Sequence, residues 1–248
     1  MGKVKKIVLL LAVLQCMIIL SGCWDQKIFE ETGFILSLGL ELNEEGELIY
    51  SATMPVVEEE IEQDVEVMYT TAPLLREARD KIRNTSGKRV EGGKTQQILF
   101  SRELAEKGLD EILDVFLRNP ENPVLANITV VEGSPLEMLQ LSLGYKDKTR
   151  IGFYISNLID QTRKRTSTPE TRIYDLAVLL HCKTIDPIAT YMKYDDKKVE
   201  ILGTALFKED KMVGDLNVTD TGILHALMGK KQTSVTITGK TAMMLKAA

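Results

Sequence analysis

Residues 33–54 read GFILSLGLEL, then NEEG, then ELIYSATM, so that two largely apolar runs flank a short polar segment. β-Branched, aromatic and aliphatic side chains favour strands, and a polar segment containing Asn and Gly favours a turn. The sequence therefore predicts a β-hairpin with strands at Gly33 to Leu42 and Glu47 to Met54, turning at Asn43 to Gly46. We expect the rest of the chain to pack around it.

Apolar residues at helical spacing alternate with short strand-like runs downstream of the hairpin. Helices are expected at residues 73–83, 102–107, 109–117, 135–143, 148–165 and 173–180, and strands at residues 96–100 and 124–131. The composition shifts near Asp186-Pro187, after which strands are expected at residues 188–194, 199–207, 212–216 and 233–238, with a helix at 222–228. This pattern predicts an α+β fold, a mixed β-sheet with packed helices, followed by the start of a second strand-rich α+β domain.

Hydroxyl residues stand where several of these helices begin. Ser101 and Thr219 are predicted to cap the helices that follow them. Ser134-Pro135-Leu136-Glu137 and Ser167-Thr168-Pro169-Glu170 match the capping box, in which the acid reaches back to the first backbone N–H. Leu136, Leu139 and Leu143 are expected to form the inner face of the helix after Ser134.

The N-terminus has three lysines, Lys3, Lys5 and Lys6, and an apolar run from Ile7 to Leu20, followed by Ser21-Gly22-Cys23. A basic start, a short apolar segment and small residues before a cleavage point are typical of a secretory signal. Leu20-Ser21-Gly22-Cys23 resembles a bacterial lipobox. Signals of that class carry a diacylglycerol thioether on the Cys and are cut before it. We therefore predict cleavage between Gly22 and Cys23, with S-diacylglycerol and an N-acyl group on Cys23.

Two other interpretations of this segment stay open. The apolar run could be an uncleaved membrane helix, although a span needs about 20 apolar residues. It could also be an ordinary signal peptide in which Cys23 stands by chance.

The composition is that of a globular protein, with 44% hydrophobic and 27% charged residues. Removing the signal with its three lysines lowers the net charge from −5 to −8. An acidic surface argues against nucleic-acid binding, which uses clustered Lys and Arg. After processing and lipidation, Cys182 is the one remaining thiol, so an intrachain disulfide is excluded.

Chemical motifs are weak in this chain. Gly92-Gly93-Lys94-Thr95 resembles the end of a phosphate-binding loop, but the first Gly of that motif is replaced by Lys88, and a strand is expected to follow it. His181 and Cys182 are adjacent, which on a helix points their side chains about 100° apart, so a buried structural Cys is the favoured interpretation. No His pair has metal-ligand spacing and no nucleophile elbow is present, so we predict no catalytic residues, no metal and no cofactor.

Several stretches together resemble the Ger(x)C family of spore germination lipoproteins. They are Cys23-Trp24-Asp25, Leu38-Gly39-Leu40, the segment from Leu99 to Gly108, and the segment from Leu202 to Lys208 with Met212-Val213-Gly214. The resemblance implies a non-catalytic subunit of a nutrient germinant receptor, anchored at the outer face of the spore inner membrane beside A-type and B-type membrane subunits.

The same resemblance implies the domain organisation. Residues 1–22 are predicted to be the lipoprotein signal peptide, 23–190 the N-terminal germination-protein domain, and 195–248 the truncated beginning of the C-terminal domain, because family chains continue further. The family also commonly has His where Lys94 stands here, so no role is carried over to that position.

A solute-binding lipoprotein that delivers a small molecule to a transporter is the alternative function. Such proteins need two sizeable lobes around a cleft. One α+β domain followed by a short strand-rich segment fits that organisation poorly.

Overall fold

The computed structural model describes residues 2–20, 31–56, 65–119, 122–144, 151–165, 168–182 and 184–229. The chain divides into two units, Met1–Thr32 and Gly33–Ala248. In the first, α1 (Gly2–Leu20) contains the predicted apolar signal segment. Its companion residues Ser21, Gly22 and Cys23 lie outside the described residues.

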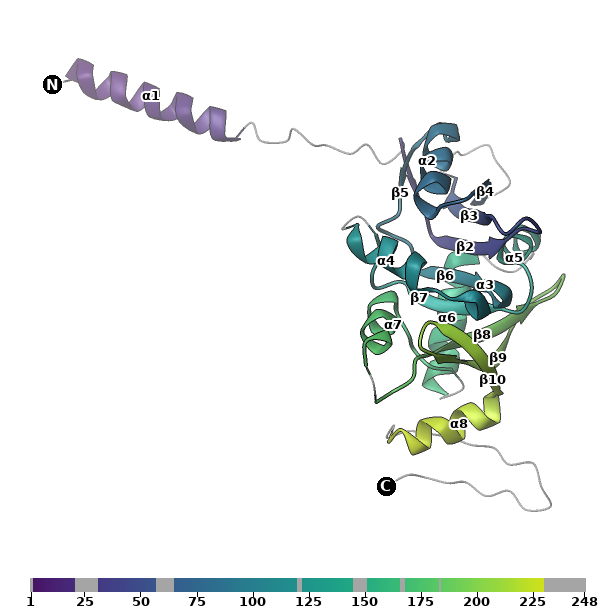
Figure 1. Ribbon diagram of the computed structural model, residues 1–248. Helices are drawn as coiled ribbons and strands as arrows, with labels where there is room; N and C mark the ends of the chain where they lie inside the picture. The colour runs from purple at the N-terminus through teal and green to yellow at the C-terminus, as the bar shows by residue number, and fades with distance from the viewer. Residues whose placement is uncertain are drawn as a thin grey trace. The chain divides into compact units, whose positions relative to one another are not determined.

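The second unit is built on an eight-stranded mixed sheet, ordered β10-β9-β8-β7-β6-β2-β3-β4 (Figure 1). Its strands are β2 (Ser37–Leu42), β3 (Leu48–Pro55), β4 (Val65–Ala72), β6 (Gln97–Ser101), β7 (Asn127–Val131), β8 (Ile188–Tyr194), β9 (Val199–Lys208) and β10 (Lys211–Asn217). The four central strands β2, β6, β7 and β8 run parallel to one another, and the outer pairs are antiparallel. A second, two-stranded sheet joins β1 (Thr32–Phe34) to β5 (Arg89–Glu91).

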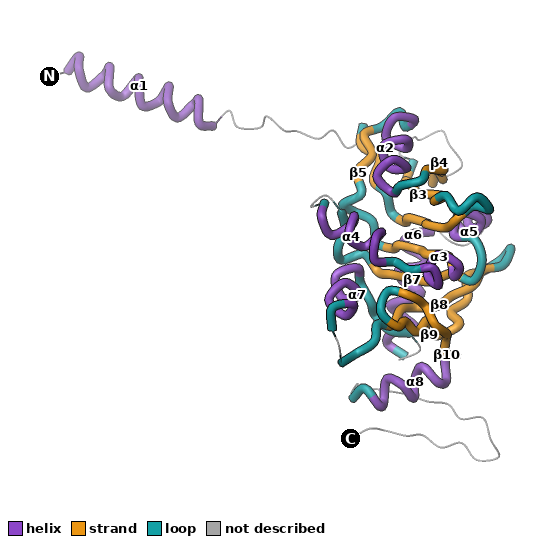
Figure 2. Tube along the Cα trace, in the orientation of Figure 1, coloured by secondary structure: helices purple, strands orange, loops and turns teal. Residues whose placement is uncertain are grey.

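Helices cover both faces of the large sheet, as Figure 2 shows. The larger core cluster contains α2 (Leu75–Thr85), α3 (Arg102–Lys107), α4 (Asp110–Arg118) and α7 (Ile173–Leu180). The opposite cluster contains α5 (Pro135–Ser142) and α6 (Ile151–Lys164). The middle of β6 is apolar on both faces, because Ile98 and Phe100 enter the first cluster and Leu99 enters the second. The remaining helix, α8 (Val218–Leu227), packs on β9 and β10.

The predicted hairpin is confirmed as β2 and β3, whose register pairs Leu42 with Leu48 across the turn. Its first strand begins at Ser37 and not at Gly33, because Gly33 and Phe34 belong to β1, which pairs with β5 in the second sheet. Gly46 in that turn has φ +82°, a conformation that favours glycine. Gly39 in β2 has a different role. A Cβ there would lie 2.3 Å from Ser51 Oγ and 2.9 Å from Pro135 Cβ, so only glycine lets α5 approach the sheet.

The α+β class, the mixed sheet and its packed helices are therefore confirmed. Strands β8 to β10, expected after the composition shift, extend this same sheet, because β8 pairs with β7 on one side and with β9 on the other. The predicted boundary at residues 190–195 thus falls at the end of β8 within a continuous sheet. The assignment of residues 195–248 to a second domain stays a prediction, and the expected strand at 233–238 lies outside the described residues.

Several local predictions were wrong. A short strand, β5, lies between α2 and β6, where no strand was predicted. Leu143 is exposed, and Met138 with Leu139 forms the buried face of α5. The N-cap of α7 is Arg172, whose N–H donates to the Asp175 carboxylate at 3.1 Å, and that of α8 is Asn217 instead of Thr219. At α8 the Asn217 side chain accepts from the Asp220 N–H at 2.9 Å and so takes the role expected of Thr219.

Candidate functional site

The carboxyl ends of the parallel strands form an open groove with a volume of about 370 Å³. Open α/β sheets commonly bind ligands at this edge, because polar loops from neighbouring strands meet there. The groove is lined by Glu41, Leu42, Ser101, Arg102, Glu103, Glu106, Gly133 and Ser134. Two polar clusters occupy it, one centred on Arg102 and the other on Glu41.

Arg102, the first residue of α3, is the hub of the first cluster. Its guanidinium donates to Glu106 at 2.8 Å, to Glu132 at 3.1 Å and to the Tyr191 hydroxyl at 2.8 Å. Asp215 on β10 lies 3.5 Å away as a further ion-pair partner. The hydrogen bonds that it donates to Glu106 and Glu132 raise the pKa of Arg102 above its usual range. This side chain ties α3 to strands β8 and β10.

The Glu41 carboxylate, on β2, is the centre of the second cluster. It accepts hydrogen bonds from the Ser134 hydroxyl at 2.8 Å and from the Leu136 N–H at 2.9 Å. Both donors belong to the first turn of α5, where a negative charge is favourable. Glu41 is 8% exposed, so its charge is held by these donors and not by water.

Tyr194 on β8 completes this cluster and corrects the predicted capping box. Ser134 Oγ accepts from the Glu137 N–H at 3.1 Å, as expected of a cap. The return bond is absent among the described contacts, because the Ser134 N–H donates to the Tyr194 hydroxyl at 3.3 Å and that hydroxyl donates to Glu137 at 2.6 Å. Burial, followed by the hydrogen bond to Glu137, raises the pKa of Tyr194 above its usual value.

The hydrogen-bonding capacity of this groove is largely used within the protein. Arg102 has carboxylates around it, and Glu41 has the helix terminus, so neither is poised to polarise a substrate. A catalytic acid or base must be able to exchange a proton with the substrate during the reaction. The arrangement is better suited to holding α3, α5 and the sheet together.

The other residues considered from the sequence are dispersed. Thr95 donates its hydroxyl to Gly92 O at 2.7 Å and is followed by strand β6, so the Gly-Lys-Thr segment does not open a helix that could bind phosphate. His181 Nδ1 lies 3.0 Å from Ala177 O at the end of α7, and Cys182 Sγ lies 3.2 Å from Thr184 Oγ1. Cys182 is half-buried and not fully buried as predicted.

The described ranges contain neither a candidate metal site nor a candidate membrane-spanning helix. No cluster of three or more His, Cys, Asp or Glu side chains there could hold a metal ion. None of the helices in those ranges has the length and apolar character needed to cross a membrane. The predicted lipidation site at Cys23 lies beyond them and stays a prediction.

Sequence reasoning did not single out Glu41, Arg102 or Tyr194. Arg102 lies in the Leu99 to Gly108 segment and Glu41 in the predicted hairpin, but apart from Glu106 their partners lie 30 or more residues away in the chain. One sequence signal pointed to Glu41, because it is a charged residue in an otherwise uncharged, largely apolar strand.

Comparison with known proteins identifies the family. Residues 25–194 match the family described as "Spore germination protein N-terminal domain". The chain belongs to this Ger(x)C family of spore germination proteins. The resemblance found in the sequence is thereby confirmed.

Two relatives of this Ger(x)C protein are informative about length. Spore germination protein GerQC of Bacillus cereus is 26% identical over 215 residues, covering 85% of this chain and 58% of GerQC. A solved structure, described as the crystal structure of the GerBC protein, aligns with a TM-score of 0.43 and 14% identity, covering 82% of this chain and 59% of GerBC. The Ger(x)C chain thus spans somewhat more than half the length of both.

Proposed function

We propose that this Ger(x)C protein is a lipid-anchored, non-catalytic subunit of a spore nutrient germinant receptor. The observation that carries the proposal is the family match over residues 25–194. The lipobox-like Leu20-Ser21-Gly22-Cys23 supports an anchor at the outer face of the spore inner membrane. The internally satisfied groove supports a role without catalysis.

In this proposal the protein acts by docking to A-type and B-type membrane subunits. An anchor confines the protein to the membrane plane, where effective concentrations reach about the millimolar range, so modest contacts suffice. Such contacts are typically apolar patches with a polar rim. Two groups of exposed apolar side chains are candidates.

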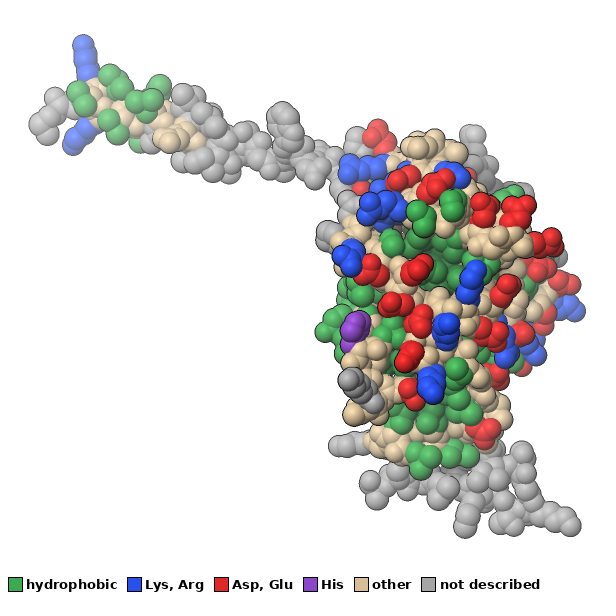
Figure 3. All heavy atoms as spheres, viewed as in Figure 1, with side chains coloured by type: hydrophobic (Ala, Val, Ile, Leu, Met, Phe, Trp, Pro, Cys, Tyr) green, Lys and Arg blue, Asp and Glu red, His purple; other side chains and the backbone are tan. Residues whose placement is uncertain are grey.

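The first group, which we call the α4–α7 patch, consists of Leu117, Leu125, Tyr174 and Val178. Leu125 is 66% and Val178 is 51% exposed. The loop carrying Leu125 is fixed against α7, because the N–H groups of Ile173 and Tyr174 donate to the carbonyls of Ala126 and Val124. Figure 3 shows hydrophobic side chains over this part of the surface, with acidic and basic side chains interspersed elsewhere.

The second group, the α8–β10 patch, consists of Val213, Ile223, Leu227 and Met228. It lies in the strand-rich part of the chain after Asp186. We favour the α4–α7 patch for the partner subunits, because it lies inside the family-matched residues 25–194 and the α8–β10 patch does not.

Docking is tested by copurification from mildly solubilised spore membranes. Val178→Glu places a charge in the α4–α7 patch and should reduce recovery of A-type or B-type subunits by about tenfold. Val213→Glu is the comparison variant, since it places the same charge on an exposed Val of the α8–β10 patch. Equal recovery with both variants would refute the docking surface. Failure of the parent protein to recover any membrane subunit would refute docking itself.

Anchoring is tested with Cys23→Ala. Each buried CH₂ of an acyl chain contributes about 0.8 kcal/mol to membrane binding, so loss of the acylated Cys should leave an uncut precursor or a soluble product. Metabolic labelling with a radioactive fatty acid and membrane fractionation would show this. If the variant is cut and sediments with membranes as the parent does, the lipoprotein assignment is wrong.

A further inference from the structure

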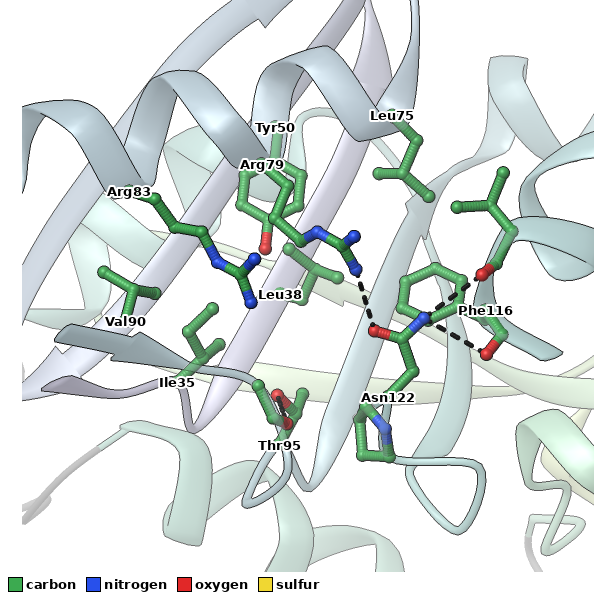
Figure 4. A pocket seen from close by; sticks show the side chains of 13 residues that line it. Ile35, Leu38, Tyr50, Leu75, Arg79, Arg83, Val90, Thr95, Phe116 and Asn122 are labelled. Carbon is green, nitrogen blue, oxygen red and sulfur yellow. Dashed lines mark hydrogen bonds between the residues drawn. The ribbon is translucent and has the colours of Figure 1, made fainter. Parts of the chain in front are cut away.

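A small cavity lies between α2 and the face of the sheet formed by β2 and β3, with the α4–β7 loop on its third side (Figure 4). Its volume is about 30 Å³. Apolar side chains form most of the wall, among them Ile35, Leu38 and Phe116. The polar side chains that line it are Tyr50, Arg79, Arg83, Thr95 and Asn122.

Arg79 presents hydrogen-bond donors to this cavity that the protein does not fully use. One terminal nitrogen donates to Asn122 Oδ1 at 3.2 Å. Asn122 is itself fixed, because its amide nitrogen donates to the carbonyls of Val115 and Phe116. The Nε–H of Arg79 is buried and has no acceptor among the described residues. A buried donor on a charged group without an acceptor is costly, and this indicates that something else accepts from it.

Tyr50 offers a second donor. Its side chain is 3% exposed, and its hydroxyl makes no hydrogen bond within the described part of the chain. Figure 4 shows this hydroxyl pointing toward the space between Arg79 and Arg83. Burial raises the pKa of Tyr50 to about 12, partly opposed by the charges of Arg79 and Arg83. The phenol is therefore protonated at neutral pH and able to donate.

The charge and size of the cavity limit the ligands that it can bind. The cavity presents the unused Nε–H donor of the Arg79 guanidinium, and none of its lining residues is acidic, so an anion is favoured. One water molecule needs about 10 to 15 Å³ of such a cavity, so a ligand here would take the place of about two or three water molecules. A carboxylate with a tail of one or two carbons fits those limits, whereas a phosphate ester or a sugar does not. The apolar wall would contact the tail.

We propose that this cavity binds a small carboxylate, which accepts hydrogen bonds from Arg79 and Tyr50 and lies beside the charge of Arg83. The carboxylate belongs either to a free small molecule or to an acidic side chain of another protein. The cavity and the α4–α7 patch share α4 and the loop after it, but no residue lines both, and this proposal does not depend on the docking proposal.

The probe for a free ligand is acetate labelled with ¹³C at the carboxyl carbon, titrated into the purified full chain in detergent and followed by NMR. We expect a saturable shift below about 100 mM that chloride at equal ionic strength does not displace. A short peptide with one internal Glu and blocked ends is the probe for a protein side chain. Saturable binding of acetate alone would identify the natural ligand as a free small molecule. Tighter binding of the peptide would identify it as an acidic side chain of another protein.

Variants locate the binding. Arg79→Gln should weaken it by about tenfold or more, and Tyr50→Phe by a few fold, because each removes donors to the carboxylate. Arg76→Gln is the matched control: it removes the same charge from an exposed position of α2 and should leave affinity unchanged. Circular dichroism checks that each variant folds. The proposal is overturned if neither probe binds, if chloride competes equally, or if Arg79→Gln and Arg76→Gln behave alike.

Discussion

Two helices of this protein begin in similar surroundings but are held in different ways. Helix α3 follows β6 and α5 follows β7, and these strands are parallel neighbours in the sheet. Each helix has a Ser at its N-cap, Ser101 and Ser134. At α3 the cap is local, since Ser101 Oγ accepts from the Leu104 N–H at 3.2 Å. At α5 the cap also binds Glu41 from β2 and Tyr194 from β8.

A local capping signature therefore does not determine which groups form hydrogen bonds with the N-terminus of a helix. The better match in sequence is at α5, where Ser134 and Glu137 have capping-box spacing. Yet there the reciprocal bond is replaced by a tyrosine from a strand 57 residues away. The stability of α5 is thus coupled to the sheet, whereas the cap of α3 depends on its own turn.

The largest effect is expected from Glu41→Gln. The substitution keeps the shape but removes the charge that accepts from Ser134 and Leu136. Hydrogen bonds to a charged group contribute about 1.5 to 3 kcal/mol, so we expect the free energy of unfolding to fall by about 2 kcal/mol. Urea denaturation measures it. Glu44→Gln, at an exposed position of the hairpin turn, is the control. A fall for Glu41→Gln no larger than that for Glu44→Gln would contradict the role of the Glu41 carboxylate at α5.

A smaller loss, of about 1 kcal/mol, is expected for Tyr194→Phe, because the Ser134 N–H loses its acceptor and Glu137 loses a donor. The same variant tests a pH dependence. The folded state holds the pKa of Tyr194 above its usual value, while unfolded tyrosine ionises near pH 10.

The contribution of Tyr194 to stability should therefore be constant below about pH 10 and fall as the pH rises beyond it, since the unfolded chain then loses a proton that the native chain retains. Tyr50, whose pKa is raised to about 12, adds to this fall. Denaturation at pH 9 and pH 11 should show a smaller difference in Tyr194→Phe than in the parent. An identical difference in both would remove Tyr194 from the explanation.

The smallest expected effect is a coupling energy that distinguishes the two N-caps. Ser101→Ala and Ser134→Ala should each cost about 1 kcal/mol as N-cap losses. In double-mutant cycles with Glu41→Gln, Ser134→Ala should show a coupling energy of at least about 0.5 kcal/mol, whereas Ser101→Ala should be additive. Equal coupling for both serines would mean that α5 is capped as locally as α3.

The sequence by itself determined the features that depend on neighbours along the chain. The hairpin at residues 33–54, strand β6, the cap at Ser101 and the span of β8 all follow from side-chain period, turn composition or a hydroxyl beside a helix. The family resemblance was also readable, because Leu38-Gly39-Leu40 and its companion stretches keep their order along the chain.

The contacts between these elements are known only from the three-dimensional structure. It brought β8, β9 and β10 onto the β7 edge of the large sheet, placed Tyr194 between Ser134 and Glu137, and gathered Tyr50, Arg79 and Asn122 around one cavity. Local periodicity carries no information about such partners. Strand pairing and buried polar contacts join residues tens of positions apart, and they are selected by how the whole sheet buries its two faces.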